Sequence, residues 1–136
     1  MKRACVRRPD TATKKFAQRL HTRISESLTN TTVARLFPPR TKFCLTLVTA
    51  VNDKLILAVE ILSPEDHRWD TVTKKAIYEQ IKVPRLWMVD PRYNNVEVYH
   101  ANEYGLSLKQ ILATREVLSD PLLPNIQYDM AELFKI

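Results

Sequence analysis

The sequence contains one glycine and two cysteines in 136 residues, and these shortages narrow the functions open to it. A single glycine rules out a glycine-rich loop that cradles phosphates. Cys5 and Cys44 lie far apart without the spacing of a zinc site, which favours reduced thiols in a cytoplasmic protein. No apolar run approaches the ~18 residues of a membrane span, and no apolar signal core follows the basic N-terminus. We therefore expect a cytoplasmic protein with no membrane partner.

Positive charge is abundant but unevenly distributed. Residues 1–42 contain eleven Lys and Arg against two acidic residues, a net charge of +9, whereas the remaining residues carry −3. A helix expected over about 11–28 has an apolar stripe that includes Phe16, Leu20 and Ile24. The cations that lie largely off this stripe are candidates for binding nucleic acid: Lys14, Lys15, Arg19 and Arg23. A solvated helix face without a partner is the alternative, and the sequence leaves both open.

The apolar segment 55–62 contains a single charged residue, Glu60. A short apolar run bounded by polar residues predicts a strand that is buried on both faces. Strict alternation along this strand puts Ile56 and Glu60 on one face and Leu55 on the other. A buried ionised carboxylate is costly unless it is paired, protonated or bound to a metal. Glu60 is therefore the first candidate for a functional residue.

Together with the first helix, the sequence predicts a core of two helices and four strands. After the first helix, the expected elements are a strand over 43–51, a turn at Asn52–Asp53, the Glu60 strand, a helix from Ser63–Pro64 to about Lys82, and strands over 85–89 and 96–100. The order helix–strand–strand–helix–strand–strand indicates an α/β (α+β) protein with a mixed sheet, in which the helical crossover joins parallel strands. We expect one domain over 1–136, with a basic arm and helix in about 1–40.

The second helix carries two different stripes. Its apolar residues predict the face that packs on the core: Trp69, Val72, Ala76, Ile77 and Ile81. Asp70, Lys74 and Tyr78 recur every four residues and form a separate polar stripe. An ordinary four-apart ion pair explains Asp70 and Lys74 equally well, and Tyr78 also suits a core aromatic whose hydroxyl reaches water.

Glu60, Ser63 and Lys74 converge in this arrangement. A buried carboxylate beside a lysine and a second carboxylate, Asp70, suits a hard divalent cation such as Mg²⁺. Such a cation activates water and neutralises charge on a phosphoryl group, while the lysine stabilises the attacking hydroxide. Glu60 and Lys74 are thus the catalytic candidates, Glu60 is also the metal ligand, and Ser63, Asp70 and Tyr78 support them. A purely structural Glu60–Lys74 ion pair is the alternative.

Several motifs occur together at fixed spacing: Val59–Glu60–Ile61–Leu62–Ser63–Pro64, Asp70-x-x-x-Lys74-x-x-x-Tyr78, Val83–Pro84–Arg85–Leu86–Trp87–Met88–Val89–Asp90–Pro91, and Val96–Glu97–Val98–Tyr99. As a set, over about 55–136, they resemble the Uma-type restriction endonucleases, bacterial proteins of the PD-(D/E)xK nuclease superfamily. The resemblance implies a restriction-endonuclease-like core in which Glu60 holds Mg²⁺. It also implies that Lys74 takes the place of the lysine usually found two residues after the Glu. Lys42 stands in the slot that the family gives to an Asp.

Two functional hypotheses follow from the residues and the resemblance. The first is a Mg²⁺-dependent DNA endonuclease, which the resemblance implies and the basic first third favours. The second is a catalytically inactive nuclease-fold module that binds nucleic acid or forms oligomers, because a site with Lys42 in the Asp slot should bind Mg²⁺ poorly. Trp87 and Tyr99 on the sheet strands offer a surface for a homodimer.

Overall fold

The structure is a computed structural model that describes residues 11–27, 31–36, 45–62 and 68–135. Its elements are, in chain order, α1 (Thr11–Ser27), β1 (Thr31–Leu36), β2 (Leu45–Val51), β3 (Lys54–Ile61), α2 (Arg68–Gln80), β4 (Arg85–Asp90), β5 (Asn95–Asn102), β6 (Gly105–Ala113), β7 (Val117–Asp120), β8 (Leu123–Asp129) and α3 (Met130–Leu133). β1 to β6 form a six-stranded sheet in sequential order, and β7 pairs with β8. Within the described ranges, no helix is long and apolar enough to cross a membrane.

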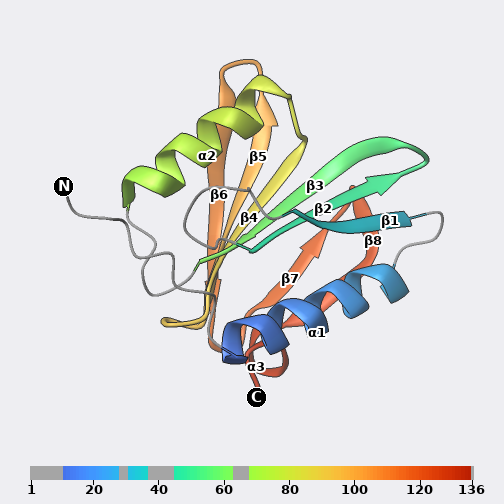
Figure 1. The fold of residues 1–136 in the computed structure, drawn as a ribbon, viewed down its shortest axis with the longest axis vertical. Helices are drawn as coiled ribbons and strands as arrows, with labels where there is room; N and C mark the ends of the chain where they lie inside the picture. The colour runs from blue at the N-terminus through green and yellow to red at the C-terminus, as the bar shows by residue number, and fades with distance from the viewer. Residues whose placement is uncertain (1–10, 28–30, 37–44, 63–67, 136) are drawn as a thin grey trace.

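The six-stranded sheet is mixed, which confirms the predicted fold class. β3 and β4 run parallel, whereas the other neighbouring pairs run antiparallel. Parallel neighbours need a long crossover, and α2 lies in the segment that connects these two strands (Figure 1). α2 covers one side of the sheet, while α1 and the β7–β8 pair lie on the other side. β3 therefore runs through the middle of the molecule, where both of its faces are buried.

The β2–β3 hairpin turns at Asn52 and Asp53, whose φ angles are 51° and 63°. Two successive left-handed residues are typical of the two-residue turn whose twist matches that of hairpin strands. Asn and Asp tolerate this conformation better than most residues. The turn predicted from the sequence is therefore confirmed.

A bulge interrupts the regular alternation at the start of β3. The pairing register shifts beyond Thr49, so that Ile56 is skipped on β3. As a result, Ile56 packs against the core on the α1 side, and Leu55 packs against the core on the α2 side. Strict alternation is thus wrong for these two residues, because a bulge inserts one extra residue and reverses the faces that precede it. Beyond the bulge, Glu60 points to the α2 side as predicted.

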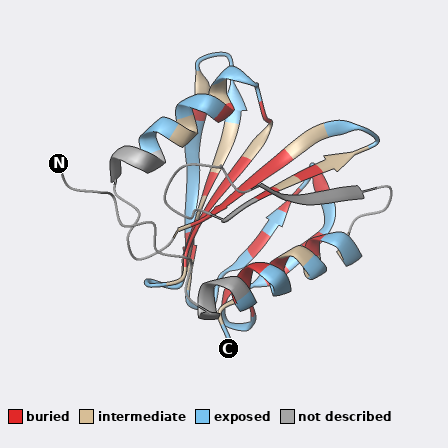
Figure 2. Ribbon diagram, in the orientation of Figure 1, coloured by how far each residue is buried: buried red, intermediate tan, exposed pale blue. Residues whose placement is uncertain are grey.

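Two hydrophobic cores lie on opposite faces of the sheet. On one face, α1 buries the predicted stripe of Phe16, Leu20 and Ile24 in the larger core, which also contains Trp87. A smaller core beneath α2 consists of Ala58, Tyr78, Val83, Leu86, Met88 and Leu106. Figure 2 shows the buried residues concentrated along the central strands and the inner side of α1. Because Trp87 is 0% exposed, its predicted part in a homodimer surface is wrong.

α2 presents to the sheet a different face from the one that the apolar pattern predicts. Val72, Ile77 and Ile81 are 60%, 50% and 54% exposed, and Ala76 is exposed as well. Tyr78, from the polar stripe, is only 9% exposed and belongs to the core beneath α2. The prediction fails because it counts apolar side chains alone, whereas the sheet below carries a buried carboxylate that polar groups must contact. The side chain of Trp69 lies outside the described part of the chain.

Two regions of strand were underestimated from the sequence. Residues 31–36 form β1, which follows the helix expected over about 11–28 and is not among the four strands expected from the sequence. The segment is rich in β-branched residues, which favour strands, but it is short and the pattern before it suggests a helix end. Near the C-terminus, β6 is one continuous strand of nine residues, which also lies outside the four strands expected for the core.

Candidate active site

Glu60 lies on β3 with its side chain directed toward α2, and the residue is 1% exposed. Its cross-strand neighbours are Thr46 on β2 and Met88 on β4. Ala58, two residues earlier on the same face, is fully buried beneath α2. A carboxylate in such surroundings needs polar partners, because burial removes most of its contact with bulk water.

Those partners come from the polar stripe of α2. The Tyr78 hydroxyl donates a hydrogen bond to Oε1 of Glu60, and the Lys74 ammonium lies 3.5 Å from Oε2. Lys74 itself is partly buried, with its side chain 21% exposed. Since Lys74 and Tyr78 are four residues apart, they occupy one face of the helix, one above the other. The structure thus brings together Glu60, Lys74 and Tyr78, as the sequence predicts.

Other predicted members of the site cannot be placed in the same way. Ser63 and Lys42 lie outside the described residues, and so does the side chain of Asp70. The described part of β2 contains no Asp or Glu, and Thr46 is the residue opposite Glu60 in the register. Among the described residues, Glu60 is therefore flanked by no second carboxylate on β2.

The described residues do not by themselves complete a metal site. They contain no group of three or more His, Cys, Asp or Glu side chains that could hold a metal ion. Mg²⁺ requires several oxygen ligands in near-octahedral geometry. Here, both carboxylate oxygens of Glu60 already contact the side chains of α2. A metal at Glu60 would have to displace Lys74 or share the carboxylate with it.

A second buried carboxylate, Asp90, lies at the end of β4 where β3 also ends. Asp90 is 8% exposed, and it stands two residues beyond Met88 on the same strand face as Glu60. Its Oδ1 accepts hydrogen bonds from the backbone and Nε of Arg92 at 3.0 and 3.1 Å, and its Oδ2 accepts one from Nη2 at 2.9 Å. This pair was not predicted from the sequence, although an Asp in a turn commonly accepts the backbone N–H of the residue two positions later.

The half-buried tyrosine Tyr99 extends the polar layer beneath α2. Its hydroxyl donates to Oε2 of Glu97 at 2.6 Å, and the Lys75 ammonium lies 5.4 Å from its ring centre. Burial, followed by the hydrogen bond and the charge of Glu97, raises the pKa of Tyr99 well above its usual range. Glu97 pairs with Met88 in the register, so one apolar residue separates it from Glu60 across the sheet.

α1, which carries the predicted nucleic-acid-binding cations, lies on the opposite side of the sheet from α2 (Figure 1), whereas the side chain of Glu60 contacts α2. Lys15 is exposed, whereas Arg19 donates hydrogen bonds to the backbone carbonyls of Lys135 and Glu132. The guanidinium of Arg23 lies 5.8 Å from the ring centre of Tyr128. The side chain of Lys14 is outside the described part. The described cations of α1, Lys15, Arg19 and Arg23, are therefore not part of the Glu60 cluster.

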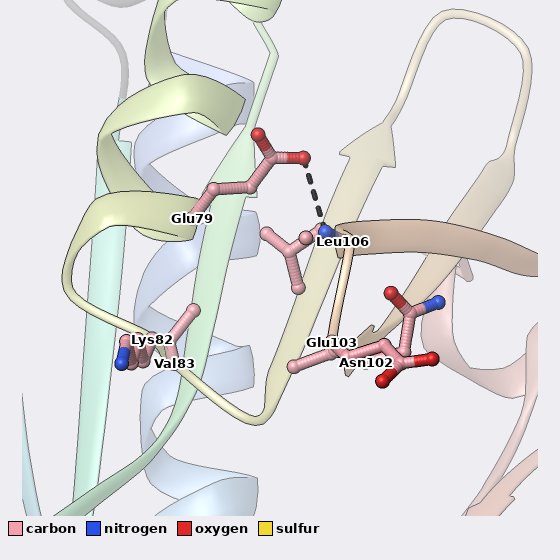
Figure 3. Close-up of a pocket in the computed structure, with 8 residues that line it drawn as sticks. Glu79, Lys82, Val83, Asn102, Glu103 and Leu106 are labelled. Atoms are coloured by element: carbon pink, nitrogen blue, oxygen red, sulfur yellow. Dashed lines mark hydrogen bonds between the residues drawn. The ribbon is translucent and has the colours of Figure 1, made fainter.

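A hollow of about 250 Å³ lies beside the C-terminal end of α2, as Figure 3 shows. Its lining comes from the end of α2 and the β5–β6 turn: Glu79, Lys82, Val83, Ala101, Asn102, Glu103, Gly105 and Leu106. Oε1 of Glu79 accepts a hydrogen bond from the backbone of Leu106 at 3.0 Å across this hollow. Neither Glu60 nor Lys74 lines it, so the hollow is separate from the candidate active site.

Comparisons with known proteins agree on the fold and the family. No curated protein matches the sequence. A solved structure that does match is described as a "putative nuclease belonging to DUF820" from Anabaena variabilis, with a TM-score of 0.69, 13% identity, and coverage of 94% of this chain and 83% of that one. At this identity the likeness concerns the fold. The Uma2 family, described as "Putative restriction endonuclease", matches residues 49–131, a span that includes Glu60, Lys74 and Asp90. The chain therefore belongs to the Uma2 family.

Proposed function

We propose that the protein is a nuclease that hydrolyses phosphodiester bonds of DNA at Glu60, with Lys74 as the cationic partner. The observation that supports this most is the contact between a fully buried carboxylate on a central strand and a lysine on the crossover helix. Buried titratable groups that meet near the end of a parallel strand are typical of functional sites. The family description and the name of the similar structure point to the same chemistry.

The three contacting side chains suit hydrolysis by water. Glu60 accepts a proton from the attacking water as the water oxygen bonds to phosphorus, and the opposite P–O bond breaks to release a sugar oxygen that takes up a proton. The Lys74 ammonium neutralises the charge that builds up on the phosphoryl oxygens. Tyr78 orients the carboxylate through its hydrogen bond to Oε1.

Plasmid nicking tests this proposal. We expect the wild type to nick supercoiled DNA in the presence of Mg²⁺ or Mn²⁺, and we expect Glu60→Gln and Lys74→Ala each to lose most of that activity, by about 10²-fold or more. Glu79→Gln is the matched control, because it also neutralises a carboxylate, but one that belongs to α2 and lines the separate hollow. Equal nicking by wild type and Glu60→Gln would overturn the assignment of the site.

We propose separately that Mg²⁺ supports the reaction, with Glu60 among its ligands. The resemblance to the nuclease superfamily supports this, whereas the single described carboxylate at the centre of the site weighs against tight binding. Calorimetric titration of the apo protein with MgCl₂ tests it, and we expect heat of binding that is lost in Glu60→Gln. Binding that is identical in both proteins would place any metal elsewhere.

A catalytically inactive nuclease-fold module that binds nucleic acid is the second candidate. The absence of any Asp or Glu from the described part of β2 favours it, and so does the exposed Lys15 on a basic helix. Such a module binds DNA through phosphates, so its affinity falls by about 10³-fold or more between 50 and 200 mM salt when it makes six to ten phosphate contacts. Lack of nicking together with salt-sensitive binding, reduced in Lys14→Ala/Lys15→Ala, would favour this function over the first.

A further inference from the structure

The turn between β4 and β5 lies at the edge of the sheet where β3 ends. The backbone N–H of Leu62, two residues after Glu60, donates a hydrogen bond to the carbonyl of Val89 at 2.8 Å. The turn 91–94 follows directly after Asp90, and Asn94 closes it with a φ of 51°. The hydrogen bond from Leu62 to Val89 thus holds the end of the Glu60 strand next to this turn.

Arg92 is held in a fixed orientation within the turn. Asp90 accepts its backbone N–H and two of its side-chain nitrogens at 2.9–3.1 Å. A guanidinium that binds one carboxylate through two nitrogens loses most of its rotational freedom. The buried carboxylate of Asp90 thus fixes a planar cation at the rim of the candidate active site.

Tyr93 presents its ring to solvent beside that cation. The residue is 70% exposed, and the guanidinium carbon of Arg92 lies 5.3 Å from its ring centre. Exposed aromatic rings combined with cations are what proteins use to stack the bases of single-stranded nucleic acid. The ring is restrained on one side by Arg92 and is open enough to accept a further planar group.

We propose that Tyr93, supported by Arg92, is a stacking platform for an unpaired base of the nucleic-acid strand whose backbone lies at Glu60 and Lys74. Met88 is opposite Glu60 in the register, so Asp90 is about 7 Å further along the strand direction, and the platform follows immediately. The inference rests on the proposed nuclease function and adds a substrate class to it. Bases inside a duplex are stacked on one another, so the platform selects single-stranded DNA or the frayed ends of a duplex.

Fluorescence of 2-aminopurine, which is quenched when the base stacks, tests the platform directly. The probe is a single-stranded oligonucleotide of about ten residues that carries 2-aminopurine, and it is titrated with protein in EDTA so that metal-dependent cleavage does not occur. We expect quenching with the wild type, a loss of quenching and about tenfold weaker binding with Tyr93→Ala, and retention of both with Tyr93→Phe. A blunt duplex of the same sequence should bind without added quenching.

Tyr104→Ala is the matched control. Tyr104 is also an exposed tyrosine on a hairpin turn, 89% exposed, but it belongs to the β5–β6 turn at the opposite end of the strands. We expect it to leave quenching and affinity unchanged. The platform is overturned if the wild type does not quench the probe, if Tyr93→Ala quenches like the wild type, or if Tyr104→Ala causes the same loss.

The failure of this inference and that of the proposed function give different results. A protein that nicks plasmid DNA through Glu60 but shows no dependence of quenching on Tyr93 retains the function and loses the platform. A protein that quenches through Tyr93 but never nicks DNA retains the platform as part of a binding module. Thermal melting of Tyr93→Ala should match that of the wild type, because the side chain is mostly exposed.

Discussion

At the scale of single residues, the organising contact is the one between Glu60 and the polar stripe of α2. It satisfies a carboxylate that is 1% exposed with a hydroxyl and an ammonium from residues spaced by one helical turn. The same contact holds the face of α2 that carries Lys74 and Tyr78 against the sheet.

Removal of the Tyr78 hydroxyl should destabilise the protein. We expect Tyr78→Phe to lower the free energy of unfolding by about 1–3 kcal/mol, because it takes a hydrogen-bond donor away from a buried carboxylate. Urea denaturation measures the change. Tyr104→Phe, at an exposed position, should change stability by less than about 0.5 kcal/mol. Equal stability of the two variants would contradict the role of the hydroxyl.

His100 should make stability depend on pH. Burial, then Arg85, lowers its pKa from the ordinary value of 6.5, while Asp120 acts in the opposite direction and Lys109 adds slightly to the lowering. The unfolded chain therefore binds more protons than the folded one in mildly acidic solution, and stability falls as the pH drops from about 6.5 through the lowered folded-state pKa. Urea denaturation at several pH values should show this fall.

His100→Gln provides the comparison for that pH dependence. The variant lacks the titrating group, so its unfolding free energy should fall less steeply between about pH 7 and pH 5. Other groups titrate in both proteins, and the difference between the two profiles isolates His100. Parallel profiles would show that protonation of His100 does not differ between the folded and unfolded states.

The sequence predicts the Glu60 cluster well because its signals are local. A lone charge in an apolar strand and a four-residue spacing on the next helix are both visible in the printed sequence. The Asp90–Arg92 pair and the engagement of Arg19 with the C-terminal carbonyls were not predicted. Arg19 and its partner carbonyls are more than a hundred residues apart, and no periodicity connects such segments.

At the scale of elements, α2 is unusual in exposing its apolar stripe. Hydrophobic spacing is a reliable guide only when apolar burial dominates the packing of a helix. Among the described contacts of α2 with the sheet, the hydrogen bond between Tyr78 and the buried carboxylate of Glu60 is prominent. Hydrophobic spacing also fails to predict β1, because six residues are too few to distinguish a strand from a loop by their pattern.

Alanine substitutions should reveal the orientation of α2. We expect Ile77→Ala to cost less than about 1 kcal/mol, because the side chain is 50% exposed and alanine has the higher helix propensity. Leu86→Ala, in the core beneath the helix, should cost about 2–5 kcal/mol because it opens a cavity. Urea denaturation of both variants gives the comparison. If Ile77→Ala proved the more costly, the opposite face of α2 would be the buried one.

At the scale of the whole molecule, an ion pair joins the two sheets. Nε of Arg85, at the start of β4, lies 2.5 Å from Oδ2 of Asp120 at the end of β7. His100 lies 3.5 Å from the same oxygen, and Oδ1 accepts the backbone N–H of Leu122 at 2.8 Å. The side chain of Asp120 is only 2% exposed, so its charge depends on these partners.

Loss of Arg85 should weaken the attachment of the small sheet. We expect Arg85→Ala to lower the free energy of unfolding by about 3–5 kcal/mol, since it leaves a buried carboxylate without its main cation. Arg85→Ala combined with Asp120→Asn should recover part of that loss in the same urea measurement. Arg115→Ala, at an exposed residue, is the control and should change little. A double variant as unstable as Arg85→Ala would show that the uncompensated charge is not the cause.

The parallel pairing of β3 with β4 divides the assembly of the sheet into two stages. Three antiparallel pairs of this sheet, β2–β3, β4–β5 and β5–β6, close through turns of two to four residues, at 52–53, 91–94 and 103–104, and short loops close quickly. β3 and β4 are joined through the α2 crossover, so we expect their pairing to be slower, because a longer loop must close. Glu60 lies on β3, between these two parts of the sheet. Its neighbour on one side is Thr46 of β2, in the same hairpin, and its neighbour on the other side is Met88 of β4, across the parallel pair. The surroundings of Glu60 are therefore complete only when β4 has paired with β3, and neither half of the sheet alone supplies them.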